Sequence, residues 1–213
     1  MAYSGPSTLA VLFDFDGVLA DTEPYHWRAW REVLRPFGIE LDWETFERTC
    51  IGVSDLAMLS GLCALSSRIV TPDQLRAQYP LKRKIFHGLV EGRSIIGEDI
   101  IDTVNSLHDK LLAVVTSSNR AEIEPILNNS GILRSLNTVV YGNDVRHYKP
   151  HPEPYLLAVE RLGVKADRAV VFEDSAAGIQ SARAAGCQVV KIESVSQLPR
   201  LVRAFLPEIF PPA

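Results

Sequence analysis

The sequence predicts an α/β fold in which a doubly wound parallel sheet is interrupted by an inserted helical domain. Three observations support this prediction: five apolar runs of strand length, helical patterns between most of them, and one long segment with helix signals but no strand. The apolar runs do not alternate with polar residues, which is typical of strands buried on both faces of a parallel sheet. The expected strands are residues 9–15, 111–115, 138–141, 169–172 and 188–192.

Helical patterns separate the strands from residue 98 onward, which gives the strand–helix repeat of a parallel sheet with crossover helices. The expected helices are residues 98–109, 121–129, 154–162 and 175–185. Asn119 and Glu122 have the spacing of a capping box, so we expect them to open the second helix. Gly163 and Gly186 are expected to end the third and the fourth.

The long segment between the first two strands predicts helices only. Between Pro24 and Gly38, four apolar residues recur at helical spacing, with the proline suited to the start of a helix. These four are Trp27, Trp30, Leu34 and Phe37. We therefore expect residues 23–93 to form a helical domain, and residues 1–22 together with 94–213 to form the domain that holds the sheet.

Composition argues against several classes of function. The 213 residues carry 22 Lys and Arg against 26 Asp and Glu, and no basic tract is long enough to follow a nucleic-acid backbone or a membrane surface. Neither a signal peptide nor a run of 18 apolar residues is present, so we expect a cytoplasmic protein. The three widely spaced cysteines argue against a disulfide framework or a zinc site. We expect a monomer or weak dimer with neither nucleic-acid nor membrane partners.

Polar residues lie at the carboxyl ends of four expected strands, and these ends share one edge of a parallel sheet. In strand order they are Asp14 and Asp16, Thr116 and Ser117, Lys149, and Glu173 and Asp174. Four carboxylates in one crevice raise each other's pKa unless a cation neutralises them. Carboxylate and carbonyl oxygens are hard ligands that suit Mg²⁺. The sequence therefore predicts that a magnesium ion and a phosphate share a site at this edge.

Four stretches resemble, in this order, the four motifs of the haloacid dehalogenase superfamily. They read "DFDGVLADT", "VVTSSN", "KPHPEPY" and "VVFEDSAAGIQSARAAG". The resemblance spans the whole chain, and it implies a Rossmann-like core with a helical type 1 cap inserted between the first two motifs. The stretch "DTEPYHWRAW", together with the fourth motif, is similar to the branch of β-phosphoglucomutases and sugar-phosphate phosphatases.

The resemblance implies a role for each motif residue. Asp14 matches the nucleophile that attacks phosphorus, and Asp16 matches the general acid that later acts as a base. The second aspartate favours phosphoryl transfer, because dehalogenases need neither that acid nor a metal. Thr116 and the backbone N–H of Ser117 match the groups that bind the phosphoryl group. Lys149 matches the lysine that neutralises the nucleophile and the phosphoryl oxygens.

The resemblance also implies the ligands of the metal. Asp14, the backbone carbonyl of Asp16 and a carboxylate of the fourth motif would bind Mg²⁺. We expect Asp174 to be the direct ligand, and Glu173 to bind directly or through water.

In the cap, His26 and Lys84 resemble residues that contact the substrate in the branch, although a packed or solvated role is also open for each. Asp55 stands where β-phosphoglucomutases carry an arginine that holds the second phosphate. A carboxylate cannot hold a phosphate dianion, so this departure favours a phosphatase over a mutase.

We therefore predict a Mg²⁺-dependent phosphatase that hydrolyses a small phosphorylated metabolite, a sugar or polyol phosphate, through an aspartyl-phosphate. One alternative is a phosphosugar mutase of the β-phosphoglucomutase type. A receiver-type phosphoacceptor module, which is not an enzyme, also combines acidic residues, hydroxyls and a lysine at strand ends. Such a module is shorter and has no helical insert, and Asp16 would shorten the lifetime of its phosphorylated state.

Overall fold

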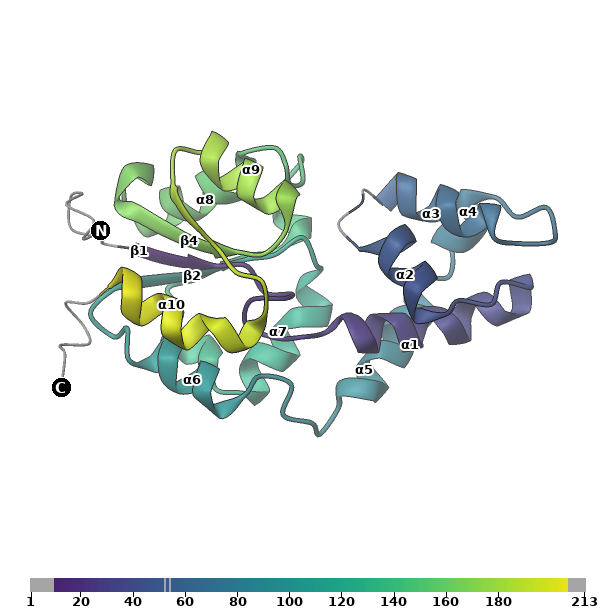
Figure 1. Cartoon of the computed structure of the whole chain (residues 1–213), viewed down its shortest axis with the longest axis horizontal. Helices are drawn as coiled ribbons and strands as arrows, with labels where there is room; N and C mark the ends of the chain where they lie inside the picture. The colour runs from purple at the N-terminus through teal and green to yellow at the C-terminus, as the bar shows by residue number, and fades with distance from the viewer. Residues whose placement is uncertain (1–9, 52, 54, 207–213) are drawn as a thin grey trace. The chain divides into compact units, whose positions relative to one another are not determined.

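The computed structural model describes residues 10–51, 53 and 55–206, apart from the side chain of Asp55, and the chain divides into two compact units (Figure 1). Thr22–Arg93 forms the second unit, and the residues before and after it form the first. The second unit is therefore an insertion that follows the first strand of the first unit.

The first unit contains a sheet of five parallel strands in the order β3-β2-β1-β4-β5. Its strands are β1 (Ala10–Phe13), β2 (Leu111–Val115), β3 (Thr138–Val140), β4 (Ala169–Glu173) and β5 (Gln188–Lys191). The central strand, β1, is buried at every residue because it has a neighbour on each side and helices on each face. The predicted fold class is confirmed, and the carboxyl ends of all five strands share one edge.

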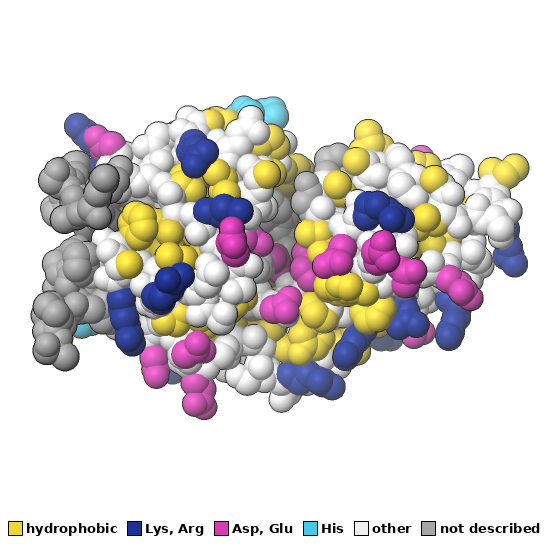
Figure 2. All heavy atoms as spheres, viewed as in Figure 1, with side chains coloured by type: hydrophobic (Ala, Val, Ile, Leu, Met, Phe, Trp, Pro, Cys, Tyr) yellow, Lys and Arg dark blue, Asp and Glu magenta, His cyan; other side chains and the backbone are white. Residues whose placement is uncertain are grey.

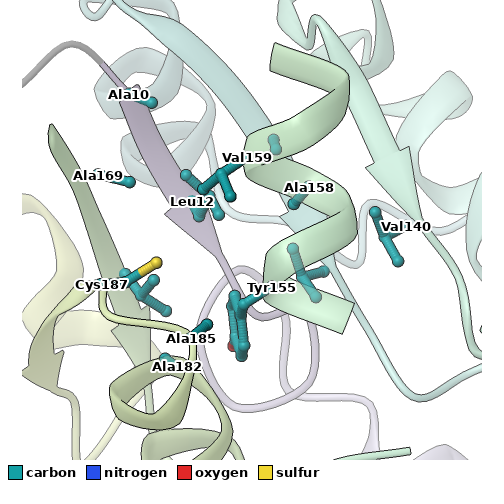
Figure 3. Close-up of a cluster of buried hydrophobic side chains, with 13 residues drawn as sticks. Ala10, Leu12, Val140, Tyr155, Ala158, Val159, Ala169, Ala182, Ala185 and Cys187 are labelled. Atoms are coloured by element: carbon teal, nitrogen blue, oxygen red, sulfur yellow. The ribbon is translucent and has the colours of Figure 1, made fainter. Parts of the chain in front are cut away.

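Helices cover both faces of this sheet (Figure 1). They are α6 (Glu98–Asn105), α7 (Arg120–Asn129), α8 (Glu153–Leu162), α9 (Ala176–Ala184) and α10 (Leu198–Phe205). Short 3₁₀ helices connect the elements: η2 (Ile132–Ser135), η3 (Gly142–Asp144), η4 (Ala166–Arg168) and η5 (Val195–Gln197). α8 and α9 enclose a buried apolar cluster on one face, in which Leu12 of β1 lies near Tyr155 and Val159 of α8 (Figure 3).

Two details of the predicted helices are wrong. Asn119 occupies the N-cap of α7 but its side chain accepts no capping hydrogen bond, so the expected capping box with Glu122 does not form. The side chain of Asn143, beyond β3, instead accepts the N–H of Arg120 at 3.0 Å. The helix expected to reach residue 109 ends at Asn105, where the Ser106 hydroxyl donates to the Thr103 carbonyl and the chain turns.

The second unit consists of helices over its described residues. They are α1 (Glu23–Leu34), η1 (Arg35–Phe37), α2 (Trp43–Cys50), α3 (Asp55–Ala64), α4 (Pro72–Arg76) and α5 (Tyr79–Val90). Gly38 ends the first helical segment with a left-handed backbone, φ +69°, as the sequence predicts. The unit has an apolar core of its own, which includes Trp30 and Leu34 of α1.

The surface agrees with the nearly balanced charge of the sequence. On the face shown in Figure 2, basic and acidic side chains are interspersed on both units. None of the helices in the described residues combines the length and the apolar composition that a membrane crossing requires.

Candidate active site

The end of β1 places two aspartates beside the end of β4. The backbone N–H of Asp14 donates to the carbonyl of Phe172 at 3.0 Å, which continues the pairing of the two strands by one residue. The chain then turns through Asp16 and Gly17. Gly17 has φ +78°, and a Cβ at this position would collide with the carboxylate of Asp174. Only glycine meets both demands, so this turn depends on Gly17.

Lys149 ties the ends of three strands together. Its ammonium donates to Asp14 Oδ1 at 2.6 Å, to Glu173 Oε2 at 2.8 Å and to the carbonyl of Val115 at 2.9 Å. These three acceptors match the three N–H groups of an ammonium. Burial alone would lower the pKa of Lys149, but the negative charges beside it, Asp14 first among them, raise that pKa well above its usual value. The lysine is therefore a fixed positive charge.

Glu173 is fully buried, and both of its oxygens are occupied. Oε2 accepts from Lys149 and, at 2.6 Å, from the hydroxyl of Tyr155. Oε1 accepts from the backbone N–H of Ser175 at 3.1 Å and from its hydroxyl at 2.9 Å. Burial alone would raise the pKa of Glu173, but Lys149 and these hydrogen bonds lower it below its usual value. The carboxylate fills the space beside Gly178, where a Cβ would collide with it.

Two other carboxylates at this edge, those of Asp14 and Asp174, are destabilised in their ionised form. Burial, followed by the charge of Glu173, raises the pKa of Asp14 well above its usual value. The same two causes raise the pKa of Asp174 to about 7. One oxygen from each of these three residues lies within 4.8 Å of the others. Hard oxygens with surplus negative charge at this spacing fit Mg²⁺.

Hydroxyl groups after β2 face the same edge. Thr116 is buried, and its Oγ1 accepts the backbone N–H of Ser118 at 3.0 Å. The hydroxyl of Ser118 donates to Asp16 Oδ2 at 3.1 Å, whereas Ser117 is exposed. Ser118 links the first and second motifs, but sequence reasoning gave it no role. The available signal was its place in a run of three hydroxyl residues at a strand end.

A second set of bonds shapes the loop that carries the lysine. Glu153 accepts the backbone N–H groups of Arg146 and His147 at 2.9 and 3.0 Å, and it contacts His147 Nδ1 at 2.7 Å. The hydroxyl of Ser181 donates to the carbonyl of His151 at 2.6 Å. The two histidines and Glu153 have the spacing of a metal site, but the Glu153 carboxylate and the Nδ1 atoms of both histidines already bond to one another or to the loop backbone.

The predicted cap residues lie in the second unit. His26 on α1 stacks on Phe86 of α5, and its Nδ1 lies 2.7 Å from the ammonium of Lys82. Burial, followed by the charge of Lys82, lowers the pKa of His26 well below its usual value, so the ring is neutral. Lys84, the lysine selected from the sequence, is exposed. The side chain of Asp55 lies outside the described residues.

The structure thus brings six of the predicted site residues together through direct contacts or through Ser118. They are Asp14, Asp16, Thr116, Lys149, Glu173 and Asp174.

Comparison with known sequences gives a consistent picture. A family model described as "Haloacid dehalogenase-like hydrolase" matches residues 11–192. "Fructose-1-phosphate phosphatase YqaB" from Escherichia coli (strain K12) is 34% identical over 184 residues, which cover 85% of this chain and 95% of the relative. "Phosphorylated carbohydrates phosphatase" from Thermotoga maritima is 34% identical over 183 residues, which cover 84% of this chain and 82% of the relative.

Solved structures share the fold. CbbY from Rhodobacter sphaeroides in complex with phosphate aligns with a TM-score of 0.75 and 26% identity, over 85% of this chain and 84% of that one. A β-phosphoglucomutase from Clostridium difficile aligns with a TM-score of 0.77 over 94% of this chain and 98% of that one. At 23% identity, the second likeness concerns the fold alone.

Proposed function

The chain belongs to the haloacid dehalogenase-like hydrolase family, and from this premise we propose that it is a Mg²⁺-dependent phosphatase of sugar or polyol phosphates that works through an aspartyl-phosphate. The 2.6 Å contact between Lys149 and Asp14 carries this assignment. In this contact the ammonium of Lys149 fixes one oxygen of the buried Asp14 carboxylate. Other carboxylates and hydroxyl groups lie at the same edge of the sheet. Such an arrangement suits a nucleophile that must approach a negatively charged phosphate.

In the first step, Asp14 attacks phosphorus through its second oxygen, Oδ2. A bond forms between that oxygen and phosphorus, and the bond from phosphorus to the sugar oxygen breaks. Asp16 donates its proton to the departing oxygen, which leaves as an alcohol. The hydrogen bond from Ser118 to Asp16 supports this role, because it orients the carboxyl group. Lys149 stabilises the charge that develops on the phosphoryl oxygens.

In the second step, a water molecule attacks the aspartyl-phosphate. Asp16, now ionised, takes a proton from the water, and the bond between Asp14 and phosphorus breaks. The products are inorganic phosphate and the regenerated carboxylate. We assign phosphate binding to Thr116 and the backbone N–H of Ser117. These groups would hold the same phosphoryl oxygens through both steps.

The metal would be held by Asp14, Asp174 and the backbone carbonyl of Asp16. Four donors already occupy the two oxygens of Glu173. This supports an indirect role, in which Glu173 would contact the metal through a water molecule. When bound, Mg²⁺ would supply positive charge that offsets the repulsion between the carboxylates and the phosphate.

The substrate class follows from the relatives. Two curated relatives are named as phosphatases of fructose 1-phosphate and of phosphorylated carbohydrates, so we propose a phosphorylated sugar or polyol for this chain. Asp55 would repel a second phosphate, which favours monophosphates over bisphosphates. We keep His26 and Lys84 as proposed substrate contacts and add Lys82, because it approaches His26.

The test is phosphate release from a panel of phosphorylated sugars, polyols and small acids, with Mg²⁺ and with EDTA. We expect release from one or more sugar or polyol monophosphates, and its loss in EDTA. Glucose 1-phosphate is assayed in parallel for conversion to glucose 6-phosphate with a sugar bisphosphate primer. Efficient isomerisation would replace the phosphatase by the mutase, and no turnover of any phosphate would reject the proposed function.

The proposed ligand Asp174 gives a separate prediction. Asp174→Asn removes the anionic charge from one ligand, so we expect the Mg²⁺ affinity measured by calorimetry to fall by about tenfold or more, the scale of charge-assisted contacts. The matched control is Asp167→Asn, on an exposed residue of η4, which should leave the affinity unchanged. An unchanged affinity in Asp174→Asn would remove this residue from the metal site.

A further inference from the structure

We propose that Tyr155 is a positioning residue of the phosphatase reaction, which acts through Glu173 to fix the ammonium of Lys149 on Asp14. This role rests on the proposed function, since it concerns the same site. Tyr155 does not touch the reacting atoms in this scheme. Its hydroxyl contacts Glu173 Oε2, and the same oxygen accepts a hydrogen bond from Lys149.

The position of Tyr155 is fixed by packing. It lies in the first turn of α8, fully buried, at the edge of the apolar cluster that α8 and α9 form with the sheet (Figure 3). The ring is therefore held by the apolar core, while the hydroxyl reaches the site. The ammonium of Lys149 lies 5.0 Å from the centre of the ring, within the range of a cation–π contact.

The hydroxyl of Tyr155 completes the set of hydrogen bonds to the carboxylate of Glu173. That carboxylate has two donors on each oxygen: Ser175 supplies both for Oε1, and Tyr155 and Lys149 share Oε2. Without the hydroxyl of Tyr155, Lys149 is the remaining donor to Oε2. The ammonium of Lys149 and the carboxylate of Glu173 can then shift together. A shift of the ammonium by a fraction of an ångström weakens its match to the charge of the transition state.

Tyr155→Phe tests the role because it removes one oxygen and keeps the ring. We expect kcat to fall by about tenfold, the scale found for groups that orient a functional residue from behind. The KM and the Mg²⁺ affinity should stay within about twofold, because neither the substrate nor the metal loses a direct contact. Tyr141→Phe is the matched control: Tyr141 is equally buried after β3, and among the described residues its hydroxyl has no hydrogen-bond partner.

Inhibition by vanadate separates positioning from a loss of folded protein. Vanadate adopts the geometry of the transition state, so its inhibition constant in Tyr155→Phe should rise by the same factor by which kcat falls. The inhibition constant of inorganic phosphate should change less than twofold. A smaller active fraction would lower kcat and leave both inhibition constants unchanged. That result, or a kcat equal to the wild type, would overturn the proposed role.

A double-mutant cycle tests whether Tyr155 acts through Glu173. In a Glu173→Ala background, Tyr155→Phe should cause no further loss of kcat, because the acceptor is gone. The same tenfold loss in both backgrounds would overturn the proposed route. These outcomes are distinct from a failure of the proposed function, which would already appear as a wild-type protein that releases no phosphate.

Discussion

We expect Asp14→Asn to lower kcat by about three powers of ten or more, because removal of an essential nucleophile has effects of this size. The amide has nearly the same shape as the carboxylate, but it cannot attack phosphorus to form the aspartyl-phosphate. The fold should persist, because Asp14 continues the pairing of β1 and β4 through its backbone N–H, which the substitution keeps.

The measurement is phosphate release from the best substrate of the panel, together with circular dichroism and thermal unfolding of the same preparation. Asp167→Asn, on the surface of the same unit, is the control for the change from Asp to Asn. Wild-type protein quenched during turnover should carry acid-stable, hydroxylamine-sensitive phosphate, and the Asp14→Asn variant should carry none. If the variant keeps more than about a hundredth of the wild-type kcat, Asp14 is not the nucleophile.

The three central strands, β1, β2 and β4, were predictable because nearly all of their residues are buried on both faces of the sheet. Burial on both faces requires a continuous apolar run, and such runs mark β2 and β4 with nearly their observed bounds. The ends of helices were less predictable where distant residues cap them. The start of α7 is capped by Asn143, which lies 23 residues further along the chain, and no local pattern contains that contact.

The expectation that functional side chains follow the carboxyl ends of parallel strands identified the charged residues of the candidate site, but not the residues that orient them. Ser118 bonds to Asp16 across 102 residues, so neither motif predicts the pair. Tyr155 occupies an apolar position of α8, and its sequence context predicts only a core residue. In the cap, the choice between Lys82 and Lys84 depends on the rotation of α5 against α1, which the three residues "KRK" do not determine.

Lys149, to which we assign a catalytic role, should also contribute to stability. Lys149 is the cation that the carboxylates of Asp14 and Glu173 share, and its side chain is only 6% exposed. Removing one partner of a buried ion pair leaves charge without compensation, which costs more than the pair itself contributes. A substitution here should therefore reduce both the rate and the free energy of unfolding.

Lys149→Met keeps the apolar stem and removes the ammonium. We expect kcat to fall by about a hundredfold or more, because charge stabilisation in a buried site is lost. The free energy of unfolding should fall by about 3–5 kcal/mol, the usual cost of leaving a buried charge unpaired. Denaturant unfolding measures the second quantity, and Lys165→Met, an exposed lysine of the same unit, is the matched control.

The pH dependence of this loss separates an electrostatic cause from a packing defect. Burial raises the pKa of Asp14 and would raise that of Glu173, and Lys149 opposes both effects. Without the lysine, both folded-state pKa values lie above their unfolded values. Each carboxyl group then binds its proton more tightly in the folded state, so the variant loses stability as the pH rises through those folded-state values. The deficit against the wild type should therefore be smaller at about pH 5 than at about pH 8. An equal deficit at both pH values would show that the methionine disturbs packing and that the two carboxylates do not depend on the charge of Lys149.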